Sequence, residues 1–523
     1  MQRRLTIILL FTIVMLGTHF NDVSAKDDEE KKNGDITAVY AGDGLSGGGL
    51  QGAVTLDVVF GGNGSANSVS RSDHTHGPHA FHCQVLVAAS GGDYTTIQEA
   101  IDSLNPSADI PCTVWVAAGD YSESPTIDKS HVHLKGAGYD RTSLQPVSNN
   151  PAVTCDGVSD VKITGFNIRD ASSCGIISIS SSVTIANNQF SDNETAVMVV
   201  GSDARIEENV FDHNGGSGLG SISIRSSKAH VSGNTFVGGE AVTTGFENGY
   251  GNITIASISE NTFTDADPAI DNNANRPGCF TRITGNLISG SGHDVGIRNN
   301  GPAVISENTI ENCALLAINS LSEQTMISNN LLRNNGANGG SAISSSGTAT
   351  ITGNTISDNP GHAVSITGGV ATVNGNTIAN NQGFGIRSAG TAVVMGNALI
   401  GNGSGCIDDS ATTIVAANLC NTSMSVLGTI TSAEDLNIEA GRDVNLRAGG
   451  DVNVDAENAA SIQAGTGVSI NAGQDMSTVA SNTVITSSAD TDIHSGHDTN
   501  IATSNNTDIA SGGTVTIKGA TFP

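Results

Sequence analysis

The sequence predicts an all-β chain whose middle is a right-handed, single-stranded parallel β-helix, in which each turn of the backbone adds one coil to a stack. Three observations support this fold class. A motif with a fixed Asn recurs every 21 to 27 residues, short alternating apolar segments separate its copies, and 64 of the 523 residues are glycine while only 14% are charged. Globular proteins have about 25% charged residues, so the composition is typical of a turn-rich β-solenoid.

The motif consists of a small or acidic residue, Asn, any residue, and then Phe, Ile or Leu. Its asparagines are 21, 25, 27, 25, 22, 22, 24, 22, 21 and 21 residues apart, which is the length of one turn of a three-sided β-helix. Asn tolerates the left-handed backbone of a sharp corner, and stacked Asn side chains hydrogen-bond from coil to coil. We expect an Asn ladder beside an apolar column, formed by Asn188, Asn209, Asn234, Asn261, Asn286, Asn308, Asn330, Asn354, Asn376, Asn397 and Asn418.

The coils begin before this ladder. Phe166 lies one coil ahead of Asn188 at the expected apolar position, and further along Ala349–Thr352 alternates as a strand with one inward face requires. Earlier still, Gly92–Asp102 has a helical pattern in which Ile97 and Ile101 share a face with Leu104. A helix is therefore expected ahead of the repeat.

With Val114–Tyr121 and Leu134–Gly138, this opening segment resembles the first coils of pectin esterases and pectate-lyase-like proteins. The resemblance covers about 60 residues and implies that the helix caps the open N-terminal end of the β-helix, where the core needs a cover. It does not extend to the chemistry, because the coils that follow lack the catalytic motifs of the esterases, a Gln-Asp pair and an Asp-Phe-Ile/Val-Phe-Gly segment.

The first residues predict export. Two arginines precede an apolar run, Leu5–Leu16, and Val23–Ala25 has the small residues of a cleavage site, so residues 1–25 are expected to be a signal peptide. The run is shorter than the roughly 20 apolar residues of a bilayer span, and no membrane span is expected. We therefore expect an extracellular protein, secreted or at a cell surface. Its predicted parts are a fibre-like segment, the β-helix and a C-terminal stalk, over residues 26–82, 83–425 and 426–523.

The stalk consists of octads. From Ala433 to Ala520 the sequence divides into eleven eight-residue repeats, and positions 4 and 6 of the first five are apolar. One such repeat is too short to enclose a core alone. The pattern resembles the intertwined three-chain β-helix of phage tail spikes and type VI secretion spike proteins, which implies a homotrimer. A narrow single-chain solenoid is the alternative.

Two details of the octads leave alternatives open. In the last third Ile occupies position 5, at Ile493, Ile501 and Ile509, which indicates either a β-bulge or a polar interior. Aspartates recur at position 3, where they form either a calcium site or a solvated stripe, at Asp435, Asp443, Asp451 and Asp475.

The N-terminal segment suggests a metal site. Ile36–Gly49 and Ser70–Gly77 resemble modules of phage tail fibres and bacterial surface fibres. The resemblance implies that His74 and His76 bind a transition metal on a threefold axis, where a trimer presents six imidazoles in the octahedral arrangement that iron accepts. Ordinary surface histidines are the alternative.

The eight cysteines predict disulfides, because an even number in an oxidising compartment favours cross-links over metal binding. Strands of adjacent coils lie about 4.8 Å apart, so cysteines one coil apart are within reach of each other. We predict sequential pairs: Cys83 with Cys112, Cys155 with Cys174, Cys279 with Cys313, and Cys406 with Cys420.

The net charge of −29 argues against a nucleic-acid partner, because no basic patch is evident that would displace counterions from phosphates. A cleft is expected where the coils lengthen, between Asn209 and Asn286, since extra residues in successive coils wall a groove. For glycoside hydrolysis this region offers paired carboxylates, and for a lyase it offers bases and cations. The candidates are Asp265, Asp267, Asp271 and Glu240 or Glu247 as acids, and Arg276, His213 and Tyr250 as lyase residues.

None of these sets matches a recognisable family motif. The single Trp115 lies in an early apolar strand, and basic residues are scarce in the central coils, which favours neutral over acidic glycans. The leading hypothesis is a trimeric extracellular fibre or adhesin that binds a glycan, a surface or another structural protein without catalysis. The alternative is a polysaccharide lyase or glycoside hydrolase.

Overall fold

The computed structural model describes residues 83–215, 220–244, 253–290, 295–409 and, with short gaps, strands between 413 and 520, together with three strands before residue 83. The chain divides into two compact units, Met1–His79 and Ala80–Pro523. In the first unit, β1 (Val39–Tyr40), β2 (Leu45–Gly49) and β3 (Leu56–Val58) form an antiparallel sheet. The predicted signal peptide and His74 and His76 lie outside the described residues.

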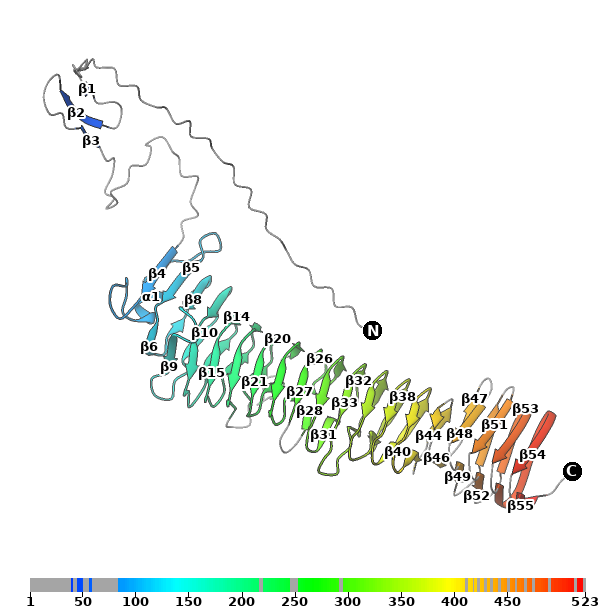
Figure 1. Cartoon of the computed structure of the whole chain (residues 1–523). Helices are drawn as coiled ribbons and strands as arrows, with labels where there is room; N and C mark the ends of the chain where they lie inside the picture. The colour runs from blue at the N-terminus through cyan, green and yellow to red at the C-terminus, as the bar shows by residue number, and fades with distance from the viewer. Residues whose placement is uncertain are drawn as a thin grey trace, which may run out of the picture. The chain divides into compact units, whose positions relative to one another are not determined.

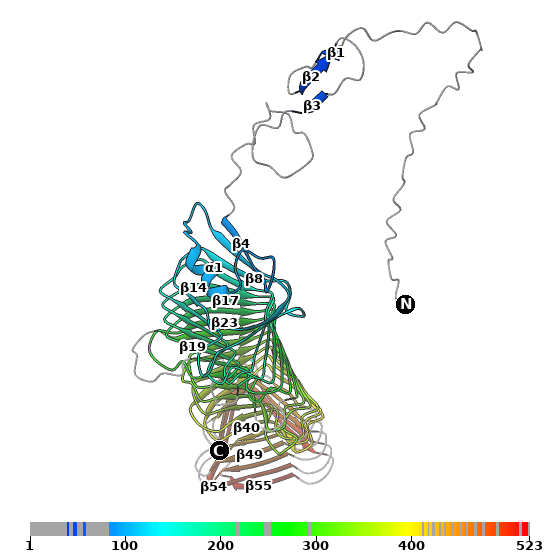
Figure 2. The ribbon, with the colours of Figure 1, turned by 90° about the vertical axis from the view of Figure 1, so that its left-hand side faces the viewer.

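The second unit is a parallel β-solenoid, as predicted, in which each coil adds one strand to each of three stacks (Figure 1). We call these stacks the first, second and third face. Strands of the first face lie one above another, as Figure 2 shows for β8, β14, β17 and β23. The first face consists of β4 (Cys83–Val87), β5 (Cys112–Val116), β8 (Val132–Gly136), β11 (Val161–Thr164), β14 (Ser182–Ala186), β17 (Asp203–Glu207), β20 (Lys228–Ser232), β23 (Ile255–Ser259), β26 (Phe280–Thr284), β29 (Ala303–Ser306), β32 (Thr325–Ser328), β35 (Ala349–Thr352), β38 (Val370–Asn374), β41 (Thr391–Met395) and β44 (Thr413–Ala416).

The second face follows the Asn corner. It consists of β6 (Gly119–Ser122), β9 (Thr142–Gln145), β12 (Asn167–Arg169), β15 (Gln189–Ser191), β18 (Val210–Asp212), β21 (Thr235–Val237), β24 (Thr262–Thr264), β27 (Leu287–Ser289), β30 (Thr309–Glu311), β33 (Leu331–Arg333), β36 (Thr355–Ser357), β39 (Thr377–Ala379), β42 (Ala398–Ile400) and β45 (Leu419–Cys420).

The third face completes each coil. It consists of β7 (Thr126–Ile127), β10 (Val153–Asp156), β13 (Ile176–Ile179), β16 (Val197–Val200), β19 (Ile222–Arg225), β22 (Val242–Thr244), β25 (Ile270–Asn272), β28 (Val295–Asn299), β31 (Leu316–Ser320), β34 (Ile343–Ser345), β37 (Val364–Ile366), β40 (Phe384–Ser388), β43 (Gly405–Asp409) and β46 (Met424–Leu427).

The predicted helix is present as α1 (Ile97–Ser103). The Thr96 hydroxyl accepts a hydrogen bond from the Glu99 backbone N–H at 3.3 Å, which satisfies one of the open donors at the helix start. Ile97, Ala100 and Ile101 are buried in the core. That α1 closes the end of the β-helix remains a prediction. Within the described part of the chain, no helix has the length and apolar character needed to cross a bilayer.

The Asn ladder is confirmed. Each ladder Nδ2 donates to the Oδ1 of the next ladder Asn, at 2.9 to 3.2 Å, from Asn188 to Asn418. The apolar column two residues later is also present and includes parallel stacked rings at Phe190, Phe211 and Phe236, with centroids 4.6 and 5.0 Å apart. A second, shorter set of stacked Asn side chains, not expected from the sequence, includes Asn359, Asn381 and Asn402 at the next corner.

The expectation that the ladder Asn itself adopts the left-handed backbone is wrong. The residue before it does, with φ of 56° at Glu208 and 57° at Glu260, and glycine occupies this position in other coils, as at Gly233. The ladder Asn keeps an ordinary backbone because its side chain turns into the stack, where it replaces the backbone hydrogen bonds that the corner interrupts.

Two of the four predicted disulfides form. Cys83 and Cys112 are register partners on β4 and β5, and Cys406 is bonded to Cys420 between β43 and β45. The other four cysteines are buried thiols, so the predicted Cys155–Cys174 and Cys279–Cys313 pairs are wrong. The physical reason is register. The residue stacked on Cys155 is Ser178, and the Cys313 backbone N–H bonds Asn335 at the second corner, whereas Cys279 precedes β26 on the first face.

The octads continue the stack within one chain. Strands β47 (Ile430–Ser432), β48 (Leu436–Ala440), β49 (Val444–Ala448), β50 (Val452–Ala456), β51 (Ala459–Ala464), β52 (Val468–Ala472), β53 (Met476–Ser487), β54 (Thr491–Ser511) and β55 (Val515–Ala520) are all parallel. Leu436 pairs with Ala460 and Val444 with Val468, so three octads form one coil. This is the pairing of a single-chain solenoid, the alternative to intertwined chains, and the trimer stays a prediction.

The position-5 isoleucines reflect a register shift. The β53–β54 pairing is irregular between Ala480 and Asn482, and Ile485 and Ile493 beyond it are buried. Of the two alternatives, the structure therefore shows the bulge, with apolar side chains still inside. The position-3 aspartates lie outside the described residues.

Candidate functional site

The lengthened coils do not wall one cleft from a single corner. Segment 265–269 joins the second face to the third, whereas segment 273–279 joins the third face to the first. Asp265 and Arg276, predicted to act together, therefore lie at different corners, and both are exposed. The candidate residues separate into those that belong to one cluster and those that do not.

Asp265 is a corner residue. Its φ of 54° and the hydrogen bond from its backbone N–H to Ser289 O at 3.0 Å repeat the geometry of Asp192 and Asn380 at the same corner in other coils. Its backbone role explains why a residue tolerant of the left-handed region is placed there. The structure does not bring it into the cluster described next.

The lyase candidates also stay apart. His213 is exposed at the same corner, where its Nδ1 lies 2.6 Å from Asp212 Oδ1. Arg276 is exposed in the segment after β25, and Tyr250 and Glu247 lie outside the described residues. Among the described residues, no base is held beside a cation in the arrangement that β-elimination requires.

Glu240, Asp267 and Asp271 are brought together at the third face. Asp271 lies on β25 between Thr243 of β22 and Arg298 of β28, in one outward column of register partners. The Arg298 Nη1 atom is 3.3 Å from Asp271 Oδ2, and Asp271 is buried. Glu240 precedes β22, and its backbone carbonyl accepts hydrogen bonds from Ser221 N at 2.7 Å and Ser221 Oγ at 3.0 Å.

The electrostatics distinguish Glu240 from Asp271. Burial and the neighbouring Asp271 carboxylate raise the pKa of Glu240, with a smaller contribution from Asp267, while Arg298 and the Gly220 backbone N–H act in the opposite direction. An ion pair such as that between Asp271 and Arg298 favours the charged carboxylate. The cluster therefore pairs a carboxyl group inclined to hold its proton with one inclined to release it, the arrangement used for acid–base chemistry.

Arg298 was not predicted from the sequence. A signal for it existed, because Arg298 lies 27 residues after Asp271, which is the longest coil spacing in the Asn series. In a coil count started at Asp271, Arg298 would have appeared as its neighbour. Among the described residues, no group of three or more His, Cys, Asp or Glu is placed to hold a metal ion.

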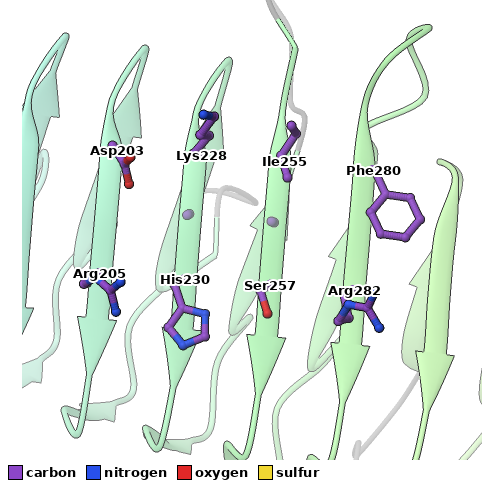
Figure 3. A pocket seen from close by; sticks show the side chains of 10 residues that line it. Asp203, Arg205, Lys228, His230, Ile255, Ser257, Phe280 and Arg282 are labelled. Atoms are coloured by element: carbon purple, nitrogen blue, oxygen red, sulfur yellow. The ribbon is translucent and has the colours of Figure 1, made fainter.

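A separate groove crosses the outer side of the first face. Figure 3 shows two rows of side chains on β17, β20, β23 and β26. The upper row is Asp203, Lys228, Ile255 and Phe280, and the lower row is Arg205, His230, Ser257 and Arg282. The small Ser257 lies between His230 and Arg282, and the groove is shallow, with a volume of about 250 Å³.

This groove corrects two expectations. Basic side chains are few in the chain as a whole, but four of them gather here on four neighbouring strands. Trp115 lies in an early strand, as expected, but it is exposed on the outer side of this face, and the Lys135 Nζ is 4.3 Å from its ring centroid. The scarcity of basic residues is therefore not a property of this surface.

A family model described as "Right handed beta helix region" matches residues 121–266 and 269–420, which together are more than half of the chain. The chain belongs to the right-handed β-helix family. The predicted handedness of the β-helix is thereby established, and both matched segments lie within the coils of the three faces. No curated protein matches the chain.

Solved structures resemble the β-helix only distantly. An alginate lyase from Paenibacillus is 16% identical over 64% of this chain and 99% of that chain, with a TM-score of 0.33. A GH87 α-1,3-glucanase catalytic unit from Streptomyces thermodiastaticus is 16% identical over 58% of this chain and 62% of that chain, with a TM-score of 0.38. The pectin methylesterase PemA from Erwinia chrysanthemi is 11% identical over 44% and 79%, with a TM-score of 0.27. These values give no information on substrate.

Proposed function

We propose that this β-helix protein is an extracellular fibre protein that binds a glycan at its third face and hydrolyses it. The observation that supports this most strongly is the raised pKa of Glu240 beside Asp271, which is ion-paired with Arg298. Glycoside hydrolysis uses one carboxylic acid to protonate the leaving oxygen and a second carboxylate as nucleophile or base. Glu240 is the proposed acid and Asp271 the proposed carboxylate.

The position of the cluster fits a polymeric substrate. Asp271, Thr243 and Arg298 lie in an outward column that runs along the stack, so a chain lying along the third face passes each of them in turn. Asp267, adjacent in sequence to β25, adds a further acceptor for sugar hydroxyls. An extracellular setting is supported by the two disulfides and by the signal peptide expected from the sequence.

The proposal includes a homotrimer, a transition metal at His74 and His76, and calcium at the position-3 aspartates. These parts rest on the sequence alone. A glycan- or surface-binding fibre without catalysis is the second candidate. It is favoured by the uninterrupted strand pairing from the β-helix into the octads, in which β45 pairs with β48 and β46 with β49. Such continuous pairing suits a stiff spacer.

One experiment separates the two candidates. The protein is incubated with a panel of neutral and acidic polysaccharides, and new reducing ends and the absorbance of unsaturated uronates are followed. Hydrolysis predicts new reducing ends without that absorbance. We expect Glu240→Gln and Asp271→Asn to lower the rate by about 100-fold or more, since positioned acids and bases contribute factors of this size.

The control is Asp265→Asn, which alters a carboxylate of the same region at a corner where Asn occurs in other coils. Its rate should stay near that of the unmodified protein. Because the acid must be protonated, activity should fall as the pH rises through the elevated pKa of Glu240. Glycan binding without any new reducing ends would leave the non-catalytic fibre, and equal activity of Glu240→Gln would refute the assignment of the acid.

A further inference from the structure

The outer side of the first face has an unusual charge distribution. One column of register partners runs from Gln84 on β4 to Val393 on β41, and it contains no Asp or Glu, although the chain has 51 acidic residues and only 22 Lys and Arg. Its central part is His133, Lys162, Thr184, Arg205, His230, Ser257 and Arg282, which we call the cationic column.

The cationic column is straight and evenly spaced because its residues are register partners on successive strands. Six strand spacings of about 4.8 Å separate His133 from Arg282, so the column is roughly 29 Å long. Lys228 lies beside it, two residues from His230 on β20. The column is therefore long enough to contact several units of one extended polymer, rather than a single small ligand.

Few of these charges are neutralised within the protein. Arg205 forms an exposed ion pair with Glu207 at 3.3 Å. In the described part of the chain, no carboxylate pairs with Lys162, Lys228 or Arg282. Burial and the neighbouring Lys162 ammonium hold the pKa of His133 below its usual value, which agrees with a positive local potential.

The groove adds an apolar wall to this column. Ile255 is 42% exposed, and Phe280 is half-buried next to Arg282 (Figure 3). An aromatic ring offers a flat apolar surface to the face of a sugar, while adjacent guanidinium and ammonium groups bind carboxylate or sulfate oxygens. The column is one side chain wide and is embedded in a chain of net charge −29, which repels a broad polyanion such as a nucleic-acid duplex.

We infer that the outer side of the first face is a second binding site, which takes one linear polyanionic glycan bearing carboxylate or sulfate groups along the cationic column. The site is independent of the proposed hydrolysis, because the Glu240 and Asp271 cluster is on the third face. It anchors the protein to an acidic matrix or capsule whether or not the third face is catalytic.

Binding of the full-length protein to immobilised polygalacturonate, a sulfated glycosaminoglycan, neutral dextran and a DNA duplex tests this inference. We expect both acidic glycans to bind and dextran not to bind, with affinity falling as salt rises. The two acidic arms distinguish carboxylate from sulfate recognition. The double variant K228Q/R282Q should weaken binding by about 10-fold, which corresponds to 1.4 kcal/mol shared between two exposed contacts.

The matched control is R333Q/R387Q, which removes the same charge from the second and third faces. It should bind as the unmodified protein does, and so should Glu240→Gln. Circular dichroism checks that each variant is folded. The inference is overturned by equal binding of dextran, by equal loss in K228Q/R282Q and R333Q/R387Q, by no effect of K228Q/R282Q, or by a preference for the duplex. Failure of hydrolysis alone leaves it intact.

Discussion

Each ladder asparagine joins three coils. Asn261 Nδ2 donates to Val231 O at 2.9 Å and to Asn286 Oδ1 at 3.0 Å, and its own Oδ1 accepts from the Asn234 backbone N–H and from Asn234 Nδ2, both at 3.0 Å. The side chain is 1% exposed, so water cannot replace these bonds. The chemistry of an amide, with a donor and an acceptor on one short side chain, is what the corner requires.

Asn261→Ala should therefore destabilise the β-helix. It leaves the Val231 carbonyl and the Asn234 amide without partners, and each buried unsatisfied group costs about 1 to 3 kcal/mol. Urea unfolding followed by circular dichroism measures the change. Asn275→Ala, at an exposed Asn in the segment after β25, is the control and should change the unfolding free energy by no more than about 0.5 kcal/mol. Equal effects of the two variants would contradict the structural role of the ladder.

His362 should make stability depend on pH. Its Nδ1 accepts a hydrogen bond from the Phe384 backbone N–H at 2.9 Å, so the neutral ring is required, and burial together with the Arg387 guanidinium lowers its pKa. A lowered folded-state pKa means that the unfolded chain takes up the proton first as the pH falls. The stabilisation is full above the unfolded pKa of about 6.5 and is lost as the pH falls through the folded pKa.

The measurement is thermal unfolding at pH 7.5 and at pH 5. The unmodified protein should lose more stability on acidification than His362→Gln, which has no titrating ring, while His230→Gln on the outer side of the first face should behave as the unmodified protein does. If His362→Gln and the unmodified protein lost the same stability, the neutral-ring requirement would be wrong.

At the scale of elements, the same side-chain type has different consequences on the two sides of a strand. Phe236 on β21 is fully buried and stacks between Phe211 and Phe263, with centroids 4.6 and 4.7 Å away. Phe280 on β26 points outward into the groove of the first face. Strand alternation thus separates stability from recognition within a few coils.

Phe236→Ala should lower the unfolding free energy by about 3 to 5 kcal/mol, because a rigid stack of coils cannot close over the cavity. Phe280→Ala should change it by about 0.5 kcal/mol while weakening polyanion binding. Chemical unfolding and the glycan-binding assay, run on both variants, check this separation. A large loss of stability in Phe280→Ala would show that the ring supports the fold instead of the groove.

The disulfides are a further test at this scale. Alkylation of the denatured, unreduced protein should label Cys155, Cys174, Cys279 and Cys313, and leave the Cys83–Cys112 and Cys406–Cys420 peptides linked. In the folded protein, Cys155 and Cys174 should resist labelling, because burial raises the pKa of each thiol to about 12. A linked Cys155–Cys174 peptide in the mass spectrum would contradict the register seen here.

For the whole molecule, the oligomeric state is the open prediction. The octads pair within one chain at a spacing of three repeats, so one chain already satisfies its own strands. A trimer would then associate through side chains or through its N-terminal segment. Light scattering after gel filtration should give about three times the mass of one exported chain, whose precursor has a mass of 52.9 kDa. The mass of a single chain would exclude the trimer and the octahedral metal site with it.

Part of the candidate site was predictable. Glu240, Asp267 and Asp271 follow from the lengthened coils, because lengthened coils are where polar side chains leave the regular stack. Asp265 was misplaced, since a corner aspartate and a site aspartate look alike in sequence. Arg298 and the cationic column were missed. Lys162, Arg205 and Arg282 are 43 and 77 residues apart, and no fixed period links them.

By itself, the sequence determined the coil period, the Asn ladder, the inward apolar columns and two of the cross-links. These are local or repeated signals, because each coil presents the same corner and the same strand alternation to its neighbour. Only the tertiary structure decided which side chains of different coils meet: Asp271 with Arg298, Arg205 with His230, and Ser178 with Cys155. Coil lengths vary at the corners, and one added residue shifts every later partner, so neighbours across coils depend on the register of the whole stack.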